Sequence, residues 1–429
     1  MNIKKIKVLL IIDQCNPEMP SVPLVAYQLF NSISKLVDVT LVTHERNRQA
    51  LENVKGNEKI VYIAESNAIA KYFKLVSYLT VGKKGVNWPL INALGYPVYV
   101  EFSHRVYQTF QAKVLTGEYD LVHAITPILP RYPVPIVEAC KNTPFVLGPV
   151  NGGVPFPKKF DKVAQKEFVY FNFLRILGQF IPGYRNTYIK ADKILVGSTY
   201  TLNMLKEKFS IVGNRIELFY ENGITEDFLN SSSKNRDPGI TNLLFVGRLV
   251  PYKGADIVIE AVSRLNKVIP QFRLTIVGDG SERENLERQA QELGVSSIVS
   301  FTGWVSQKST LEFYTKADIF CFPSIREFGG AVVLEAMACG LPCIVADNGG
   351  IAEYVTQETG FKLAPTSTEN LIQGLVDKIK ILRENEELRK SMSVKAVERA
   401  KKFAWRQKAV EIKKIYEKVI EEKHNRSMT

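Results

Sequence analysis

Short apolar runs alternate with longer segments of helical periodicity along nearly all of the chain, and this alternation restricts the fold more than any other feature. Unbroken apolar runs are typical of parallel strands that are buried on both faces of a sheet. In the first half the expected strands are Val8–Ile12, Val39–Val42, Ile60–Ile63, Leu121–Ala124, Phe145–Gly148 and Ile194–Gly197. In the second half they are Asn242–Val246, Arg273–Val277, Ile298–Thr302, Ile319–Phe322 and Cys343–Ala346. The sequence therefore predicts an α/β protein with two doubly wound, Rossmann-like domains, whose ligand-binding loops follow the strands.

The domain boundary can be placed from turn residues. A length of 429 residues predicts two or three domains. The dipeptide Asn222-Gly223 and the polar stretch that follows it mark a linker at 221–240. We therefore expect a first domain over 1–220 and a second over 241–400. Charged residues mixed with apolar residues at helical spacing predict a helical tail from Glu384 onward.

The composition excludes several classes of protein. With 45% hydrophobic and 23% charged residues, the chain is neither disordered nor fibrous. Five cysteines without a CxxC pair indicate a reducing compartment, and four histidines without an HExxH motif leave few ligands for a metal. The apolar run Val8–Ile12 ends at Asp13, so we expect a strand there and no signal peptide. We predict a cytoplasmic protein with no bound metal or cofactor and no membrane-spanning helix.

Positive charge is concentrated in the first half of the chain. Residues 1–220 contain 27 Lys and Arg against 16 Asp and Glu, a net charge of +11, whereas residues 221–429 contain 29 against 28, a net charge of +1. Such a bias favours an anionic partner, which from charge alone is nucleic acid, a phosphorylated substrate or an anionic membrane. A solvated basic face is an equally good interpretation.

The segment from Ile319 to Gly340 carries the densest chemical signal. It combines a buried strand, a loop with Glu327 and two glycines, and an apolar helix that contains Glu335. Glycines let backbone N–H groups approach a phosphate, and a helix N-terminus favours negative charge. Glu335 can accept from ribose hydroxyls, and Glu327 from the hydroxyls of a sugar. A tight turn with two solvated glutamates is the alternative, which the apolar surroundings of Glu335 disfavour.

Two cations follow the strand Asn242–Val246. Arg248 and Lys253 stand close to the end of this strand and just before an expected helix. Two cations beside a helix N-terminus suit a pyrophosphate whose charge rises as it leaves. The spacing of these two cations is weak evidence for a phosphate site by itself. It becomes specific when it is combined with Glu327 and Glu335. Complete dinucleotide-binding, P-loop and GxSxG motifs are absent.

These motifs together resemble those of retaining GT-B glycosyltransferases of family 4, the glycosyl transferases group 1. The resemblance covers about 240–360 through FVGRL with KG, IVGDG, FTGWV, FPSIREFGGAVVLEAMACG and GGIAEYV. It implies two domains that face a central cleft, with a C-terminal helix, residues 401–429, crossing back to the first domain. It also implies a nucleotide-diphosphate sugar as co-substrate, no metal requirement and no nucleic acid partner.

The resemblance also implies roles for individual residues. Arg248 and Lys253 hold the diphosphate, Glu327 holds the sugar, and Glu335 holds the ribose. The remaining donor-binding residues that it implies are Gly247, Gly303, Trp304, Val305, Phe328, Gly329, Gly330 and Ala331.

The first half departs from the family pattern. The family's active-site histidine usually ends a strand, and here Asn151, Gly152 and Gly153 stand at the comparable place. His123 is the only histidine near another expected strand end, although such a residue is more often structural. We therefore take His123, Asn151, Gly152 and Gly153 as the acceptor-side candidates.

The function expected from these features is transfer of a hexose, with retention, from a nucleotide sugar of uridine or guanosine. The acceptor is expected to be a carbohydrate or a lipid-linked sugar in cell-surface polysaccharide or glycolipid assembly. Lys158, Lys159, Lys162 and Lys166 are the residues expected to meet an anionic membrane on its inner face. The aromatic segment 168–181 that follows them has two interpretations, an interfacial helix on that membrane and core packing. The alternatives are an epimerase or phosphorylase on the same fold, or a non-catalytic scaffold that binds anions or lipids. Core packing is the preferred interpretation of segment 168–181.

Overall fold

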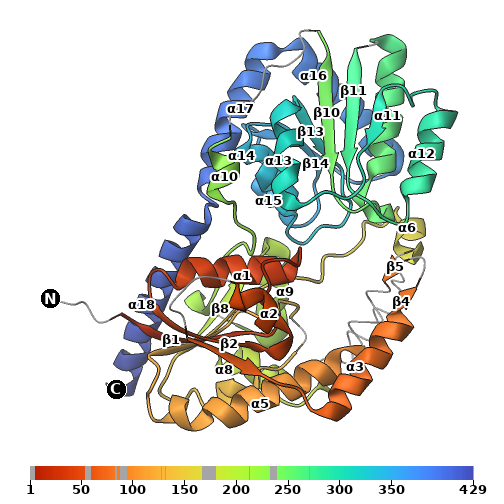
Figure 1. The fold of residues 1–429 in the computed structure, drawn as a ribbon. Coiled ribbons are helices and arrows are strands. Elements are labelled where there is room, and N and C mark those ends of the chain that lie inside the picture. The colour runs from red at the N-terminus through yellow and green to blue at the C-terminus, as the bar shows by residue number, and fades with distance from the viewer. Residues whose placement is uncertain are drawn as a thin grey trace. The chain divides into compact units, whose positions relative to one another are not determined.

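The computed structural model divides the chain into two compact units, which are described separately (Figure 1). Unit 1 comprises residues 1–153, 170–221 and 405–429, and unit 2 comprises residues 154–169 and 222–404. The structure describes residues 5–53, 59–82, 85–86, 94–126, 128–130, 132–166, 180–211, 213–231, 239–269 and 271–428.

Unit 1 is built on a parallel sheet with the strand order β3-β2-β1-β6-β7-β8-β9. Its strands are β1 (Lys7–Ile12), β2 (Asp38–His44), β3 (Lys59–Ile63), β6 (Leu121–Ala124), β7 (Phe145–Val150), β8 (Lys193–Val196) and β9 (Ile216–Leu218). In the register of this sheet, Val8 of β1 pairs with Val39 on one side and Leu121 on the other. The strand order reverses direction between β1 and β6, so the loops after these strands diverge there.

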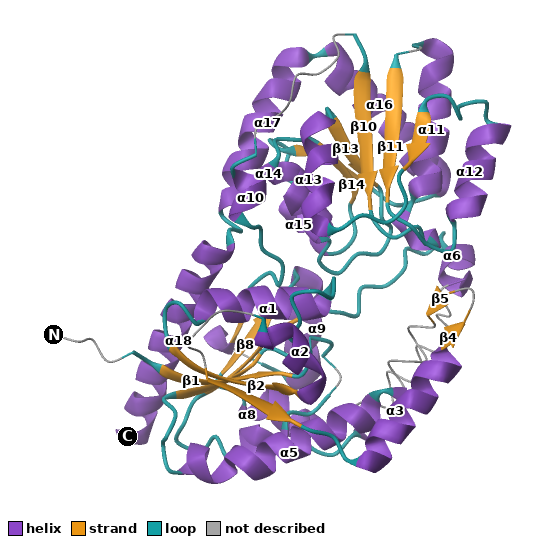
Figure 2. Cartoon of the chain, viewed as in Figure 1, coloured by secondary structure: helices purple, strands orange, loops and turns teal. Residues whose placement is uncertain are grey.

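Helices cover both faces of this sheet (Figure 2). They are α1 (Val22–Ile33), α2 (Arg48–Glu52), α3 (Asn67–Thr80), α5 (Tyr96–Leu115), α8 (Tyr184–Lys190), α9 (Thr199–Phe209) and α18 (Trp405–Met428). Leu9 and Ile11 pack on one side with Phe102 of α5, whereas Leu10 packs on the other side with Tyr416 of α18. The alternation explains why β1 is apolar from Val8 to Ile12, since both of its faces are buried there.

The C-terminal helix belongs to unit 1. The chain leaves unit 2 at Ala404, and α18 then packs Ile412, Tyr416 and Val419 into the same core cluster as α1 (Figure 1). The C-terminal helix joins the first domain as the resemblance implies, but it begins at Trp405, and residues 401–404 belong to unit 2.

Unit 2 is built on a second parallel sheet with the order β12-β11-β10-β13-β14-β15. Its strands are β10 (Thr241–Val246), β11 (Phe272–Val277), β12 (Val299–Phe301), β13 (Ile319–Phe322), β14 (Cys343–Ala346) and β15 (Gly360–Leu363). Its helices are α6 (Asp161–Lys166), α10 (Glu226–Leu229), α11 (Ala255–Val268), α12 (Arg283–Glu292), α13 (Gln307–Lys316), α14 (Ala331–Ala338), α15 (Gly350–Tyr354), α16 (Thr368–Glu384) and α17 (Glu386–Lys401). Here the strand order reverses between β10 and β13, and a ligand is expected at such a point.

Both doubly wound sheets predicted from the sequence are therefore confirmed, with two strands added. The prediction omitted β9 and β15, which are short edge strands that each include a charged residue, Glu217 and Lys362. It also omitted the antiparallel pair β4 (Val81–Gly82) and β5 (Gly85–Val86). Short strands of this kind lack the unbroken apolar run on which the prediction relied.

The assignment of residues 154–169 to the first domain differs from the structure, which groups them with unit 2. The cause is a set of contacts with distant residues: the Val154 carbonyl accepts from Arg326 Nε at 2.9 Å, and Lys166 Nζ lies 3.8 Å from Glu282 Oε2. Lys158, Lys159, Lys162 and Lys166 are thus residues of unit 2. Most of the aromatic segment 168–181 lies outside the described residues.

The charge asymmetry remains after this regrouping. Unit 1 holds 30 Lys and Arg against 19 Asp and Glu, a net charge of +11, and unit 2 holds 26 against 25, a net charge of +1. None of the helices in the described part of the chain is long and apolar enough to cross a membrane.

His123 lies on β6 in the interior of unit 1. It is fully buried, with Nε2 2.7 Å from the Gly148 carbonyl oxygen and Nδ1 2.6 Å from the Tyr416 hydroxyl. A carbonyl oxygen only accepts, so Nε2 carries the proton and Nδ1 accepts from Tyr416. Burial lowers the pKa of His123 to about 4. The histidine is neutral and joins β6, β7 and α18.

This burial predicts a pH dependence of stability. Between pH 6.5 and pH 4 the unfolded chain binds a proton at His123 that the folded chain does not bind, because the folded pKa is about 4. The stabilisation is complete above pH 6.5, and about 3 kcal/mol of it is lost as the pH falls to 4. Urea unfolding from pH 4.5 to 7.5 should give a shallower pH slope for His123→Gln than for the wild type. Equal slopes would contradict the buried neutral histidine.

Candidate active site

The loops after β10 and β11 lie directly against each other in unit 2. Gly278 has a φ of +139°, and a Cβ there would lie 2.0 Å from the Gly247 carbonyl oxygen. A Cβ on Gly280 would lie 2.3 Å from the Leu249 carbonyl oxygen. The two glycines of the IVGDG motif are therefore required by backbone packing, which fixes the path of residues 247–250.

Lys253 ends the 3₁₀ helix Pro251–Lys253 and is almost completely buried, with 9% of its surface exposed. Its Nζ forms an ion pair with Glu327 Oε2. The ammonium also lies 5.1 Å from the ring centroid of Phe322 and 5.4 Å from that of Tyr252. The structure thus brings together two predicted site residues that are 74 positions apart in the sequence.

Arg248 lies on the exposed part of the same loop. Its Nη2 donates to the Tyr252 hydroxyl at 3.1 Å. One predicted cation is therefore exposed to solvent and the other is held in a largely apolar site beside a carboxylate. An exposed guanidinium is available to bind an anion that arrives from solvent.

The loop that carries Glu327 is held by the backbone of a neighbouring loop. The Gly350 N–H lies 3.1 Å from the carbonyl oxygens of both Glu327 and Phe328. A Cβ on Gly349 would lie 1.9 Å from the Glu327 carbonyl oxygen, so only glycine fits there. The Gly-Gly pair that opens the GGIAEYV motif therefore sets the position of the Glu327 loop.

The N-terminus of α14 follows directly. Gly330, with a φ of +64°, occupies the position before the helix, and no side chain caps the first turn. A Cβ on Gly330 would lie 2.3 Å from Ile351 Cγ2, which explains the glycine. Backbone N–H groups at an uncapped helix N-terminus favour a phosphate or carboxylate.

Glu335 lies one turn further along α14 and is 4% exposed. Gln307 Nε2 donates to Oε1 at 2.6 Å, and the Tyr314 hydroxyl donates to Oε2 at 2.9 Å. Burial raises the pKa of this carboxyl above its usual range. Sequence reasoning did not identify Gln307 and Tyr314 as partners, although both lie on α13 at helical spacing. Any ribose contact at Glu335 has to replace or share these hydrogen bonds.

The remaining donor-side candidates lie after β12. The Gly303 carbonyl accepts from Gly278 N–H at 3.0 Å, which places this segment beside the loop after β11. Trp304 is 71% exposed and presents its indole to solvent. An exposed indole next to these loops can stack on a planar base.

Three of the four acceptor-side candidates, Asn151, Gly152 and His123, lie in the interior of unit 1. Asn151 is 1% exposed, and its Nδ2 lies 2.9 and 3.0 Å from the two carboxylate oxygens of Glu221. Its Oδ1 accepts from the Ser198 hydroxyl at 2.8 Å. Gly152 N–H donates to the Thr201 hydroxyl at 3.1 Å. These atoms and both ring nitrogens of His123 are occupied by internal hydrogen bonds, so the structure does not present them to an acceptor.

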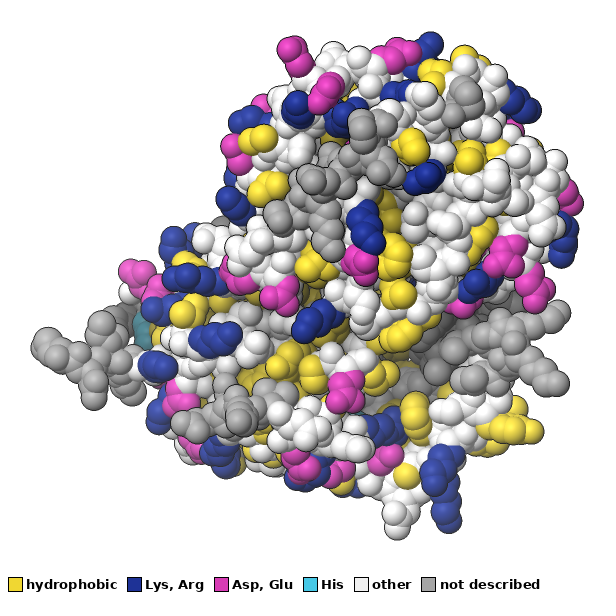
Figure 3. All heavy atoms as spheres, turned by 45° about the horizontal axis from the view of Figure 1, so that its top comes forward, with side chains coloured by type: hydrophobic (Ala, Val, Ile, Leu, Met, Phe, Trp, Pro, Cys, Tyr) yellow, Lys and Arg dark blue, Asp and Glu magenta, His cyan; other side chains and the backbone are white. Residues whose placement is uncertain are grey.

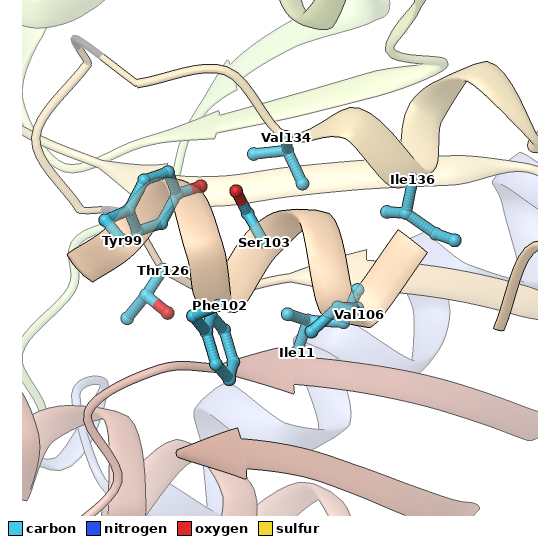
Figure 4. Close-up of a pocket in the computed structure, with 8 residues that line it drawn as sticks. All are labelled: Ile11, Tyr99, Phe102, Ser103, Val106, Thr126, Val134 and Ile136. Carbon is cyan, nitrogen blue, oxygen red and sulfur yellow. The ribbon is translucent and has the colours of Figure 1, made fainter. Parts of the chain in front are cut away.

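A small cavity lies in unit 1 at the point where the strand order reverses (Figure 4). Eight residues line it: Ile11, Tyr99, Phe102, Ser103, Val106, Thr126, Val134 and Ile136. Its volume of about 10 Å³ is close to what one water molecule needs. The Tyr99 and Ser103 hydroxyls donate to backbone carbonyls at 2.8 and 3.0 Å. This cavity is too small to receive a sugar.

Among the described residues, no group of three or more His, Cys, Asp or Glu side chains is placed to hold a metal ion. The described site combines two cations, two carboxylates, uncapped backbone N–H groups and an exposed indole.

Residues 228–399 match the family model described as glycosyl transferases group 1. An uncharacterized glycosyltransferase of Methanocaldococcus jannaschii is 32% identical over 245 residues, which are 57% of this chain and 64% of that protein. A D-inositol 3-phosphate glycosyltransferase of Corynebacterium aurimucosum is 33% identical over 179 residues, 40% of this chain and 42% of that protein. The chain thus matches about two fifths to two thirds of the length of these curated relatives.

Solved structures match the chain over almost all of its length. A glycosyltransferase from Rickettsia africae matches with a TM-score of 0.62 and 17% identity, covering 98% of this chain and 99% of that one. The Anabaena protein HepE in complex with UDP matches with a TM-score of 0.62 and 17% identity, covering 96% and 100%. WaaG, a glycosyltransferase involved in lipopolysaccharide biosynthesis, matches with a TM-score of 0.58 and 18% identity, covering 95% and 99%. The likeness confirms the GT-B fold.

The buried ion pair of the site gives a prediction about stability. Lys253→Met leaves the Glu327 carboxylate without its buried cation, and we expect a loss of about 3 kcal/mol. Glu327→Gln should also destabilise unit 2, whereas the double variant should lie within about 1 kcal/mol of the wild type, because neither charge remains unpaired. Urea unfolding of the four proteins measures this. If the double variant loses as much stability as the two single variants together, the pairing of Lys253 with Glu327 is contradicted.

Proposed function

We propose that this chain is a retaining glycosyltransferase that moves a hexose from a nucleotide-diphosphate sugar to an acceptor, and the match of residues 228–399 to the glycosyl transferases group 1 model supports this. The observation that carries the proposal is the ion pair between Lys253, from the loop after β10, and Glu327, from the loop after β13. Ligands of open parallel sheets bind beside such a reversal of strand order.

Arg248 and Lys253 are assigned to the diphosphate of the donor. Both cations stand in the loop after β10, and the uncapped N-terminus of α14 adds backbone N–H groups. As the bond to the sugar breaks, negative charge grows on the leaving diphosphate, and preplaced donors stabilise that charge. Support comes from HepE, a protein of this fold whose structures contain UDP and UDP-glucose.

Glu327 is assigned to the hydroxyls of the transferred sugar, and Glu335 to the ribose. Glu327 is ion-paired with Lys253, which leaves lone pairs of a fixed carboxylate for sugar hydroxyls. Trp304 and its neighbours Gly303 and Val305 are assigned to the base, uracil or guanine. Gly247 and Ala331 complete the donor side through their backbones.

For the chemical step we propose front-face displacement with retention. The acceptor oxygen forms a bond to the anomeric carbon on the same face from which the diphosphate leaves with its bonding electron pair. The acceptor proton passes to a phosphate oxygen of the leaving group. Glu327 is engaged by a cation and is therefore a weak nucleophile, which disfavours a covalent intermediate.

The acceptor is proposed to be a lipid-linked sugar at an anionic membrane surface, in polysaccharide or glycolipid assembly. Unit 1 carries a net charge of +11, and α3 presents a stripe of exposed residues at helical spacing: Lys71, Lys74, Leu75, Tyr78 and Leu79. Apolar side chains bordered by lysines are typical of a helix that lies on a membrane. On the face shown in Figure 3, basic and acidic side chains are interspersed, so the charge excess forms no single broad patch there.

Transfer assays test the proposed reaction. With a panel of UDP- and GDP-sugars, Arg248→Ala should lower kcat by about 10²-fold or more, because a cation aimed at the developing diphosphate charge is lost. Lys316→Ala on α13 removes an exposed lysine of the same unit and should leave the rate unchanged. The anomeric configuration of the product, read by NMR, should equal that of the donor. Rates of Arg248→Ala within threefold of the wild type would contradict the assignment.

Vesicle sedimentation tests the proposed membrane contact. Lys71→Gln with Lys74→Gln should weaken binding to anionic vesicles about 30-fold, at roughly 1 kcal/mol per lysine, and binding should fall as salt is raised. Lys401→Gln with Lys402→Gln, which removes the same charge from exposed positions of unit 2, is the matched control. A protein that ignores anionic vesicles at low salt while glycosylating a soluble acceptor would refute the membrane proposal.

A further inference from the structure

Arg326 stands immediately before Glu327 and contacts a segment that is distant in the sequence. Its Nε donates to the Val154 carbonyl at 2.9 Å. Its guanidinium carbon lies 4.8 Å from the ring centroid of Phe156 and 5.2 Å from that of Phe328. The guanidinium thus hydrogen-bonds to residues 154–156 and stacks between one ring of that segment and one ring of the Glu327 loop.

A second side chain ties the same segment to the same loop. Asn348 Nδ2 donates to the Pro155 carbonyl at 3.2 Å and to the Ile325 carbonyl at 2.7 Å. Asn348 directly precedes Gly349, which pairs with Glu327 in a parallel bridge. Two consecutive carbonyls of the segment are therefore bound, one by the Glu327 loop itself and one by the loop that pairs with it.

The segment also reaches the loop after β10. The Phe156 ring meets the Tyr252 ring edge-on, with centroids 6.5 Å apart, and Tyr252 accepts from Arg248. The Tyr252 carbonyl in turn accepts from the Ile325 N–H at 2.9 Å. Residues 154–156 thus contact both loops that supply the proposed catalytic side chains.

We propose that residues 154–156 are a structural part of the donor site of unit 2, with Arg326 as the positioning residue that fastens the Glu327 loop to them. This inference rests on the proposed function and adds to it a segment from the first half of the chain. The two loops contain Gly247, Gly329 and Gly330, so their backbones lose much conformational freedom when ordered. The hydrogen bonds to residues 154–155 and the stacked Arg326 guanidinium add to the backbone contacts that already order these loops.

The sequence of the segment suits this role. Pro155 and Pro157 restrict the backbone on both sides of Phe156, so the segment is rigid before it binds Arg326. Gly152 and Gly153 precede it with positive φ values of +155° and +86°. These two residues, taken from the sequence as acceptor-side candidates, give the chain the turn with which it enters the segment.

The test uses Arg326→Lys and Phe156→Leu in the full-length protein. Lysine keeps the charge but loses the planar stack and the Nε donor, and leucine keeps apolar bulk but loses the ring. Phe361→Leu is the matched control, since Lys378 lies 5.0 Å from the Phe361 ring in the same unit, away from these loops. Amide hydrogen exchange is followed without any substrate, at Ile325 and Gly350, whose N–H groups bond to Tyr252 and to the Glu327 loop.

Both variants should exchange these two amides at least about tenfold faster than the wild type, with the exchange of β10 and β13 unchanged. In transfer assays Arg326→Lys should lower kcat about tenfold while the donor KM changes less than threefold, because misplacement of Glu327 affects the transition state more than binding. Unchanged exchange at Ile325 and Gly350, or an equal effect in the Phe361→Leu control, would overturn the inference. Faster exchange in a protein that transfers no sugar would uphold the segment's role and refute the proposed function instead.

Discussion

The ion pair between Lys253 and Glu327 is the interaction on which the candidate site depends. A lysine that is 9% exposed beside the rings of Tyr252 and Phe322 requires a partner, since burying an isolated charge is costly. Glu327 supplies that partner, and the backbone of residues 349–350 helps to fix its loop. The pair therefore joins the loops on both sides of the reversal between β10 and β13. A stable cation–carboxylate pair at this point is well suited to receive an anion together with a polyhydroxyl group.

Unit 1 uses its buried polar groups for its own structure. Glu221 is paired with Asn151, and His123 joins β6 to α18. Lys408 of α18 is buried, donates to the Tyr220 carbonyl and lies 3.8 Å from the Phe219 ring centroid, and burial lowers its pKa to about 8. Asn151, Glu221 and Lys408 lie within a few residues of three of the points where the chain passes between the units, at 153–154, 221–222 and 404–405. Their hydrogen bonds anchor these parts of the chain within unit 1.

Much of the fold was predictable because local pattern and tertiary environment agree. The apolar runs of β1, β10 and β13 are buried on both faces, and the glycines at 278, 330 and 349 are fixed by close contacts that no side chain permits. The partners of Glu335 and the position of residues 154–156 were not predictable, because they depend on contacts across 28 and 172 residues. His123 and Asn151 show the same limit. The sequence does not distinguish a polar residue at a strand end that is buried and hydrogen-bonded inside the protein from one that is exposed to a substrate.

Calorimetric titration with UDP, GDP, UMP and GMP tests the central claim most directly, because it asks whether the paired loops recognise a diphosphate. The monophosphates keep the base and ribose but lack the second phosphate, which is assigned to Arg248 and Lys253. We expect one of the two diphosphates to bind at least about tenfold more tightly than its monophosphate, a difference of about 1.4 kcal/mol or more. Equal affinity for the diphosphate and the monophosphate, or no binding of either, would contradict the assignment of this site.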